Sequence, residues 1–384
     1  TKIGFTPIGK SDYSKILDFI PTFIAPLDKM LGGGIPFGRI TEVFSPEAVG
    51  KSTFMINLTK IATNLGVDVF WIDTEGTSDP ERMTQLGVDV NKSYVFQPDI
   101  DSGENMDIEV VQQKIEDILN AYDTPEYRKR PVLVIWDSVG MTESKTEAEA
   151  TAGDKMQLGR QATAVTALVK KLTARIKSVN MAFIAVNQVR ANVNMMNKYD
   201  KKFTRPGGKL LEHADSLRLE LGKFGDIKQN YDDETTPSKV GHHIHVTTDK
   251  NKQTRPKQRV DIALLARWYV PQTKNKEYGS QEVILDGIDY TYNLYEAARN
   301  MGLITTGGSY RKYLDKSTGE EVSLYEIDFL RKIYLDADFR RRLAIDVTAN
   351  TFTREPPVYL KNANIDISNW DETKPIADYY KGVS

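Results

Sequence analysis

The sequence predicts an α/β fold with a mostly parallel central sheet. Three near-continuous apolar runs, at residues 67–73, 132–137 and 181–188, are typical of strands that are buried on both faces of such a sheet. Helix candidates at 104–122 and 161–180 lie between these strands, and the second carries an apolar stripe at helical spacing. This alternation of strands and helices indicates a doubly wound core.

A phosphate-binding loop follows an earlier strand candidate. The apolar run at 40–44 predicts the strand, the segment at 45–53 reads SPEAVGKST, and the amphipathic run at 54–65 predicts a helix. Backbone N–H groups of such a loop and of the helix N-terminus form a pocket for polyphosphate, so we expect a nucleoside triphosphate here. The candidate ligands are Ser45, Pro46, Glu47, Ala48, Val49, Gly50, Lys51, Ser52 and Thr53.

Two of these side chains have a specific expected role. Lys51 supplies a positive charge for the β- and γ-phosphates, and the Ser52 hydroxyl is placed for Mg²⁺. Ser45 is irregular because the usual motif has Gly at this position, either for a positive φ or to avoid crowding the phosphates. Since Ser is the smallest polar substitute, we expect the loop to persist at a modest cost.

Polar side chains follow three predicted strands at their carboxyl ends, which meet at one edge of a parallel sheet. Asp137 is expected to hold Mg²⁺ directly or through water, although a strand-end Asp can also cap a turn. Glu75 can orient or deprotonate a water molecule, but position alone fits a solvated loop residue equally well. Gln188 could sense the γ-phosphate or be a turn amide.

Composition excludes several classes of protein. The chain has no Cys, which rules out disulfides and thiolate metal sites and is compatible with a cytoplasmic location. No apolar run reaches the roughly 18 residues of a membrane span, so no membrane partner is expected. Three of the four His lie at 242–245, where an ordinary strand explains them better than a metal site. The net charge of −2 neither supports nor excludes nucleic acid.

The chain divides into three parts: an N-terminal arm at 1–30, the α/β core at 31–285 and a C-terminal domain at 286–384. The arm is broken by Pro and Gly and has a short helix candidate at 16–20. The core ends in successive strand candidates without helices between them, which suggests an antiparallel extension of the sheet. The smaller C-terminal part mixes helices with turns. The late strand candidates are 216–221, 242–248 and 262–270, and the late helix candidates are 292–301 and 324–335.

A series of motifs resembles the RecA-type recombinases, a family that includes bacterial RecA and phage proteins of the UvsX kind. The resemblance covers most of residues 20–330, and the motifs occur in the family's order. They are LGGGIPFGRITEVFSPEAVGKST (31–53), IDTEGTSDP (72–80), LGVD (86–89), QPD (97–99), VIWDSV (134–139), NQVR (187–190), GGKLLEHADSLRLEL (207–221) and DKNK (249–252).

The resemblance implies a RecA-like phosphate-loop ATPase core with an N-terminal polymerisation arm and a small α+β C-terminal domain. It implies an ATP- and Mg²⁺-dependent protein that polymerises on single-stranded DNA, searches double-stranded DNA for homology and exchanges strands. Glu75 would be the water-activating carboxylate and Gln188 the γ-phosphate sensor. Lys250 and Lys252 would reach across the subunit interface to the neighbour's γ-phosphate, as an arginine finger does.

Two loops of this family face the DNA. The first corresponds to residues 147–160 and the second to 190–209, where six basic residues and one acid give a local charge of +5. Such a loop can neutralise phosphates, and its Met and Tyr residues can stack on bases without sequence preference; the alternative is a solvated basic loop. The expected DNA contacts are Met156, Arg160, Arg190, Met195, Lys198, Tyr199, Lys201, Lys202, Arg205, Gly207 and Gly208.

Some positions depart from the bacterial pattern. Arg82 falls where those proteins have an aromatic residue that stacks on adenine, and a guanidinium plane can stack as well. Glu212 and His213 replace a Lys-Phe pair that is tied to the subunit interface, so Lys209 or Arg218 could be the basic partner instead.

Two other functions fit the same core. A hexameric helicase would form a closed ring and unwind duplex DNA, whereas a non-catalytic recombination mediator would bind ATP only to hold a scaffold together. The complete set of Lys51, Ser52, Glu75 and Asp137 favours an enzyme. Single-strand-binding and loader proteins are expected as further partners of a recombinase.

Overall fold

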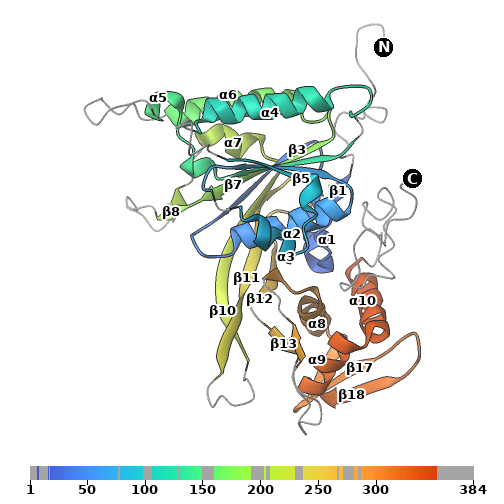
Figure 1. Ribbon diagram of the computed structural model, residues 1–384. Helices are drawn as coiled ribbons and strands as arrows, with labels where there is room; N and C mark the ends of the chain where they lie inside the picture. The colour runs from blue at the N-terminus through green and yellow to red at the C-terminus, as the bar shows by residue number, and fades with distance from the viewer. Residues whose placement is uncertain are drawn as a thin grey trace.

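The computed structural model describes residues 7, 16, 18–76, 78–97, 106–128, 130–148, 160–191, 203–204, 208–229, 237–265, 268–270, 281–283 and 287–352. Within them, a nine-stranded sheet has the order β15-β12-β11-β10-β3-β7-β6-β4-β5 (Figure 1). Strands from β10 to β5 are parallel, and β11, β12 and β15 extend the sheet antiparallel. The mostly parallel sheet and its antiparallel extension are therefore confirmed.

Apart from β5, the central strands lie at or close to the apolar runs that predicted them. The central strands are β3 (Arg39–Ser45), β4 (Asp68–Asp73), β5 (Ser93–Phe96), β6 (Val132–Asp137) and β7 (Met181–Gln188). All of β6 is buried, as its apolar sequence requires. The outer strands are β10 (Leu217–Gln229), β11 (Ser238–Asn251), β12 (Arg259–Leu265) and β15 (Gly287–Ile288). The β10–β11 pair is longer than predicted, since the exposed residues in the distal half of β10 lack the apolar run that marked the other strands.

Helices cover both faces of the sheet (Figure 1). One face carries α2 (Lys51–Asn64) and α3 (Pro80–Gln85), and the other carries α4 (Ile108–Tyr122), α5 (Lys145–Ala148), α6 (Arg160–Arg175) and α7 (Gly208–Ala214). Alternate residues of β3 serve the two layers, since Val43 joins the α2 core and Ile40 joins the α4–α6 core. Helix α4 begins later than predicted because the Asp107 side chain caps it by accepting from the Val110 N–H at 2.8 Å.

The described part of the N-terminal arm packs on its own core. The predicted helix at 16–20 is wrong at its end, because β1 (Phe19–Ile20) pairs antiparallel with β2 (Ile35–Pro36). Helix α1 (Ala25–Leu31) follows, and Leu27 is fully buried. An intersubunit role of the arm at 1–30 stays a prediction, and most of its residues before 18 lie outside the described residues.

The C-terminal part is α+β. Two of the late predicted elements differ from the structure. Residues 324–325 belong to β18 rather than to the helix predicted at 324–335, and the strand predicted at 262–270 divides into β12 and β13. The remaining elements are α8 (Tyr290–Asn300), α9 (Glu326–Leu335), α10 (Ala337–Thr351), β13 (Trp268–Val270), β14 (Gln281–Val283), β16 (Ile304–Gly307), β17 (Tyr310–Leu314) and β18 (Glu321–Tyr325). None of the described helices combines the length and apolarity that a membrane crossing needs. The division at 30 and 285 stays a prediction.

Candidate functional site

The carboxyl ends of four parallel strands bring the predicted nucleotide residues together. Ser45 at the end of β3 lies beside Gln188 at the end of β7, and Asp73 at the end of β4 lies beside Asp137 at the end of β6. The phosphate loop leaves this edge and leads into α2. The sheet register therefore places the predicted phosphate, metal and water-activating groups at one edge.

Backbone geometry of the loop requires Gly at position 50 but not at position 45. Gly50 has φ +112°, and a Cβ there would lie 2.4 Å from Leu264 Cδ1. Ser45 instead keeps the strand conformation of β3 and is fully buried. Its Oγ donates to the Pro46 carbonyl at 2.6 Å and accepts from Lys51 Nζ at 3.1 Å. The Ser is therefore accommodated as part of the polar lining of the loop.

Lys51 lies inside the loop. Besides Ser45 Oγ, its Nζ donates to the carbonyl oxygens of Ser45 at 3.3 Å and Pro46 at 3.0 Å. Burial lowers the pKa of Lys51, and the carboxylates of Asp137 and Glu75 oppose this shift. Because its nearest acceptors are neutral, the ammonium charge is available to an incoming phosphate.

Glu75 is held by two partners, one directly after the end of β6 and one at the end of β7. Its Oε1 accepts from Ser138 Oγ at 2.6 Å and from Gln188 Nε2 at 3.3 Å. The structure thus connects the predicted catalytic carboxylate directly to the predicted γ-phosphate sensor. Sequence reasoning did not single out Ser138, although it directly follows Asp137 in the VIWDSV motif.

Asp73 is a second residue that sequence reasoning missed. Its carboxylate accepts from the N–H groups of Glu75 at 3.1 Å, Gly76 at 2.9 Å and Ser78 at 2.7 Å. It also accepts from Gln97 Nε2 at 3.0 Å. Asp73 therefore shapes the turn that presents Glu75. A nearly continuous apolar strand that ends in Asp, as at 67–73, was the available signal.

Asp137 fits the predicted metal role. Its Oδ2 is buried and has no hydrogen-bond partner within the described part of the chain. Burial, followed by the negative charges of Glu75 and Asp73, raises the pKa of Asp137 to about 7. A divalent cation would satisfy this oxygen and favour its ionised form. Ser52 is exposed at the start of α2, where its hydroxyl can serve the same cation.

Replacement of Asp137 by Asn should separate stability from function. The folded-state pKa is raised above the unfolded value of 3.8, so ionisation of Asp137 increasingly destabilises the free protein as pH rises from about 4 to about 7. Above this range, we expect Asp137→Asn to raise the free energy of unfolding by up to about 4 kcal/mol while abolishing Mg²⁺-dependent ATP hydrolysis.

Thermal unfolding at pH 5.5 and pH 8 measures the change in stability, and an ATP hydrolysis assay with and without Mg²⁺ measures the loss of function. The exposed Asp117→Asn is the matched control and should show no pH-dependent gain. Equal destabilisation of the Asp137 variant at both pH values would contradict the assignment.

Lys250 and Lys252 lie away from the phosphate loop of their own protomer. Lys250 is paired with Arg218, which is paired with Glu42, three residues before the end of β3. Glu42 lies on the face of the sheet that α6 and α7 cover, whereas α2 covers the other face. Lys252 lines a pocket of about 310 Å³ together with Arg39 and Lys177, at the start of β3 and thus at the end of the strand opposite the phosphate loop.

For the predicted adenine and DNA contacts, the structure gives at most the element in which each residue lies. Arg82 lies on the exposed side of α3, and its adenine contact stays a prediction. Arg160 begins α6, Gly208 begins α7, and Arg190 lies in β8 (Arg190–Ala191), which pairs antiparallel with β9 (Phe203–Thr204). The start of the second predicted DNA loop, two residues after Gln188, therefore lies beside its residues 203–204. The other DNA-contact candidates lie outside the described residues, namely Met156, Met195, Lys198, Tyr199, Lys201, Lys202, Arg205 and Gly207.

The histidines form an ordinary strand, as expected. His242 and His243 lie in β11, where His242 Nε2 lies 3.1 Å from the Val49 carbonyl and His243 Nε2 lies 3.1 Å from Glu296 Oε2. Across the described residues, no group of His, Asp and Glu has the arrangement of a metal site built from three or more such side chains.

The fold and the gathered strand-end residues define a phosphate-loop nucleotide-binding protein. Comparison with known proteins is more specific, because the RecA N-terminal domain model matches residues 2–268. Protein RecA of Aquifex aeolicus is 32% identical over 305 residues, which cover 79% of this chain and 76% of the relative. Protein RecA of Thermus aquaticus is 32% identical over 310 residues, with 79% and 78% covered. The chain belongs to the RecA family, and its function is homologous recombination by DNA strand exchange.

Proposed function

We propose that this recombinase hydrolyses ATP in composite sites between neighbouring protomers of a filament on single-stranded DNA. One observation carries the proposal: Lys51, Glu75, Asp137 and Gln188 gather at one sheet edge, while Lys250 Nζ is bound to the end of α7, on the face of the sheet opposite α2. A cation that cannot serve its own nucleotide can serve a neighbour's. Nothing in the comparisons favours a ring helicase or a mediator.

Each residue at the edge has a distinct task. Glu75 activates the attacking water, with Ser138 and Gln188 fixing its carboxylate. Lys51 and the loop N–H groups bind the phosphates, and Asp137 and Ser52 would hold Mg²⁺, which neutralises phosphate charge. Gln188 contacts Glu75 directly. Loss of the γ-phosphate would therefore change the position of Gln188 and, with it, the start of the second DNA loop.

Assembly would complete the site. Negative charge on the transferring phosphoryl group is stabilised by additional cations, and a cation supplied by a neighbour makes turnover depend on contact between protomers. Lys250 and Lys252 would supply these charges. Such contacts are head-to-tail and do not close, which is the geometry of a helical filament.

The second DNA loop provides a test of the DNA contact. Charge reversal at Lys201 and Lys202 should weaken single-strand binding and reduce the slope of log K against log salt by about 1.4, because two phosphate contacts are lost. Reversal of Lys228 and Lys239 on the exposed β10–β11 strands changes the net charge equally and should leave the slope unchanged. An unaltered affinity and slope in the Lys201/Lys202 variant would place the DNA elsewhere.

The proposal as a whole is tested by ATP hydrolysis and electron microscopy with and without single-stranded DNA. We expect DNA to stimulate hydrolysis several-fold and filaments to appear with ATP. Hydrolysis that is indifferent to DNA, without filaments, would overturn the proposal. Double-stranded DNA would be the second DNA substrate, and single-strand-binding and loader proteins are further proposed partners.

A further inference from the structure

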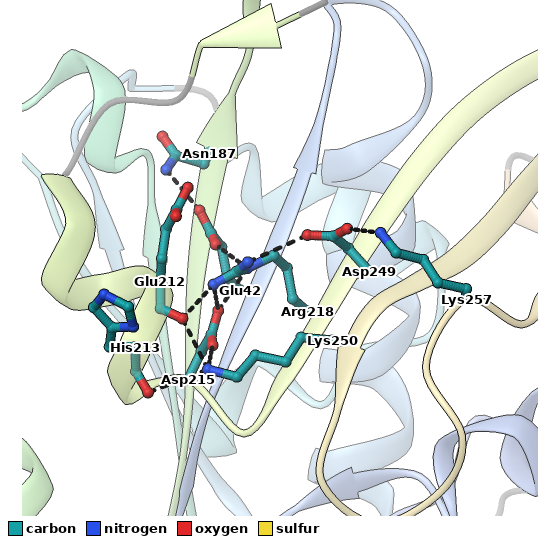
Figure 2. Close-up of polar contacts among 9 residues, drawn as sticks. All are labelled: Glu42, Asn187, Glu212, His213, Asp215, Arg218, Asp249, Lys250 and Lys257. Atoms are coloured by element: carbon teal, nitrogen blue, oxygen red, sulfur yellow. Dashed lines mark hydrogen bonds and ion pairs between the residues drawn. The ribbon is translucent and has the colours of Figure 1, made fainter. Parts of the chain in front are cut away.

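A largely buried group of charges surrounds Arg218 on the face of the sheet that α7 covers (Figure 2). The Arg218 cluster comprises Glu42, Asp215, Arg218, Asp249, Lys250 and Lys257. Arg218 contacts three carboxylates: Asp215 at 2.7 Å, Glu42 at 2.9 Å and Asp249 at 3.2 Å. Its side chain is only 7% exposed, so it is not available as the alternative basic partner for a neighbour.

Lys250 is bound within this cluster by three acceptors. Its Nζ donates to Asp215 Oδ1 at 2.7 Å and to the carbonyl oxygens of Glu212 at 2.8 Å and His213 at 3.1 Å. An ammonium group has three N–H donors, so this arrangement uses all of them. The two carbonyls lie at the C-terminal end of α7, where a cation is favoured.

Asp215 cannot follow Lys250 out of the cluster. Its side chain is fully buried, and its Oδ2 is held by Arg218. The cluster contains three acids and three bases, and departure of Lys250 would leave a buried excess of one negative charge. Asp215 therefore sets how easily Lys250 can leave its own protomer.

Chain neighbours connect the cluster to both proposed ligand sites. Glu42 Oε1 accepts from Asn187 Nδ2 at 3.1 Å, and Asn187 directly precedes the sensor Gln188. Helix α7, which provides two acceptors for Lys250, begins at Gly208, within the last residues of the second predicted DNA loop. A shift at either place would alter the surroundings of Lys250.

We propose that Asp215 is a positioning residue that holds Lys250 on its own protomer, together with the last carbonyls of α7, until ATP and DNA are bound. This rests on the proposed cross-subunit role of Lys250. A weaker interaction between Asp215 and Lys250 should let Lys250 reach the neighbouring site without DNA. The regulated quantity is then the ratio of turnover with DNA to turnover without it.

The first test is the isosteric variant Asp215→Asn, which removes the charge and keeps the volume. We expect DNA-independent ATP hydrolysis at filament-forming concentrations to rise about tenfold, since a charge-assisted bond is lost. The DNA-stimulated rate should change little. Adding Lys250→Ala to this variant should remove the rise. Asp249→Asn is the matched control, because Asp249 contacts Arg218 but not Lys250.

The second test measures the amine itself and does not depend on catalysis. In the free protein, acetylation of Lys250 by acetic anhydride, followed by peptide mass spectrometry, should be several-fold faster in Asp215→Asn than in wild type. It should be unchanged in Asp249→Asn. Reactivity of the exposed Lys239 provides the internal reference, and thermal unfolding shows whether each variant is folded.

The outcomes separate this inference from the proposed function. The holding role of Asp215 would be overturned by equal Lys250 reactivity in folded wild type and Asp215→Asn. It would also be overturned if Asp215→Asn lost the same fraction of turnover with and without DNA. Normal DNA-stimulated turnover in Lys250→Ala would instead overturn the cross-subunit assignment on which it rests. A rise in DNA-independent turnover that requires Lys250 supports both.

Discussion

Replacing Glu75 with Gln should lower ATP turnover by about 10²–10⁴-fold, because a general base contributes that much to the rate. The substitution keeps the shape of the side chain, and its amide oxygen can still accept from Ser138 Oγ and Gln188 Nε2. ATP and DNA binding should therefore persist. Steady-state hydrolysis measured alongside nucleotide affinity and DNA affinity separates the two effects.

The exposed Glu81→Gln in α3 is the matched control, since it removes a nearby carboxylate with no catalytic role. A normal rate in the Glu75 variant would instead support a non-catalytic scaffold. A parallel loss of ATP binding would indicate that Glu75 serves the nucleotide rather than the water.

Replacing Lys250 with Ala should leave ATP binding by the free protomer intact and lower DNA-stimulated hydrolysis by about 10³-fold, a typical loss for a cation supplied by a neighbour. Its Nζ contacts the end of α7, on the face of the sheet opposite α2, so its removal should not disturb the loop around Lys51. Nucleotide titration of the dilute protein and hydrolysis assays on single-stranded DNA measure the two quantities.

This variant also breaks an ion pair with the buried Asp215, so thermal unfolding must accompany the assay. Lys257→Ala is the matched control, because Lys257 pairs with Asp249 in the same cluster and has no proposed role across the interface. DNA-stimulated turnover at the wild-type rate in Lys250→Ala would remove the cross-subunit assignment.

Strong local patterns made the central fold predictable from the sequence. The short, β-branched-rich apolar runs at 67–73, 132–137 and 181–188 are typical of strands covered on both faces, and the phosphate loop is defined by its own residues. The N-terminal strand β1 was missed because it is two residues long and depends on pairing with β2. Residues 324–325 were assigned to a helix because β18 runs into α9 without a loop, so no turn residue marks the boundary between them.

The candidate site was predictable as a set of strand ends, but its internal contacts were not. The sequence indicates that Glu75, Asp137 and Gln188 share an edge, yet only the register shows that Gln188 and Ser138 hold the same oxygen of Glu75. Likewise, the position of Lys250 in DKNK suggests a role but not its three acceptors. Contacts between distant residues depend on packing that no local pattern encodes.

The central claim is that one protomer's Glu75 works with its neighbour's Lys250, and a subunit-mixing experiment tests it most directly. Glu75→Gln and Lys250→Ala should each be nearly inactive on single-stranded DNA. In an equal, random mixture, about a quarter of the interfaces would combine an intact Glu75 with an intact Lys250 from the neighbour. We therefore predict that mixing restores about a quarter of the wild-type rate. A mixture that forms filaments yet stays as inactive as its two components would contradict the account.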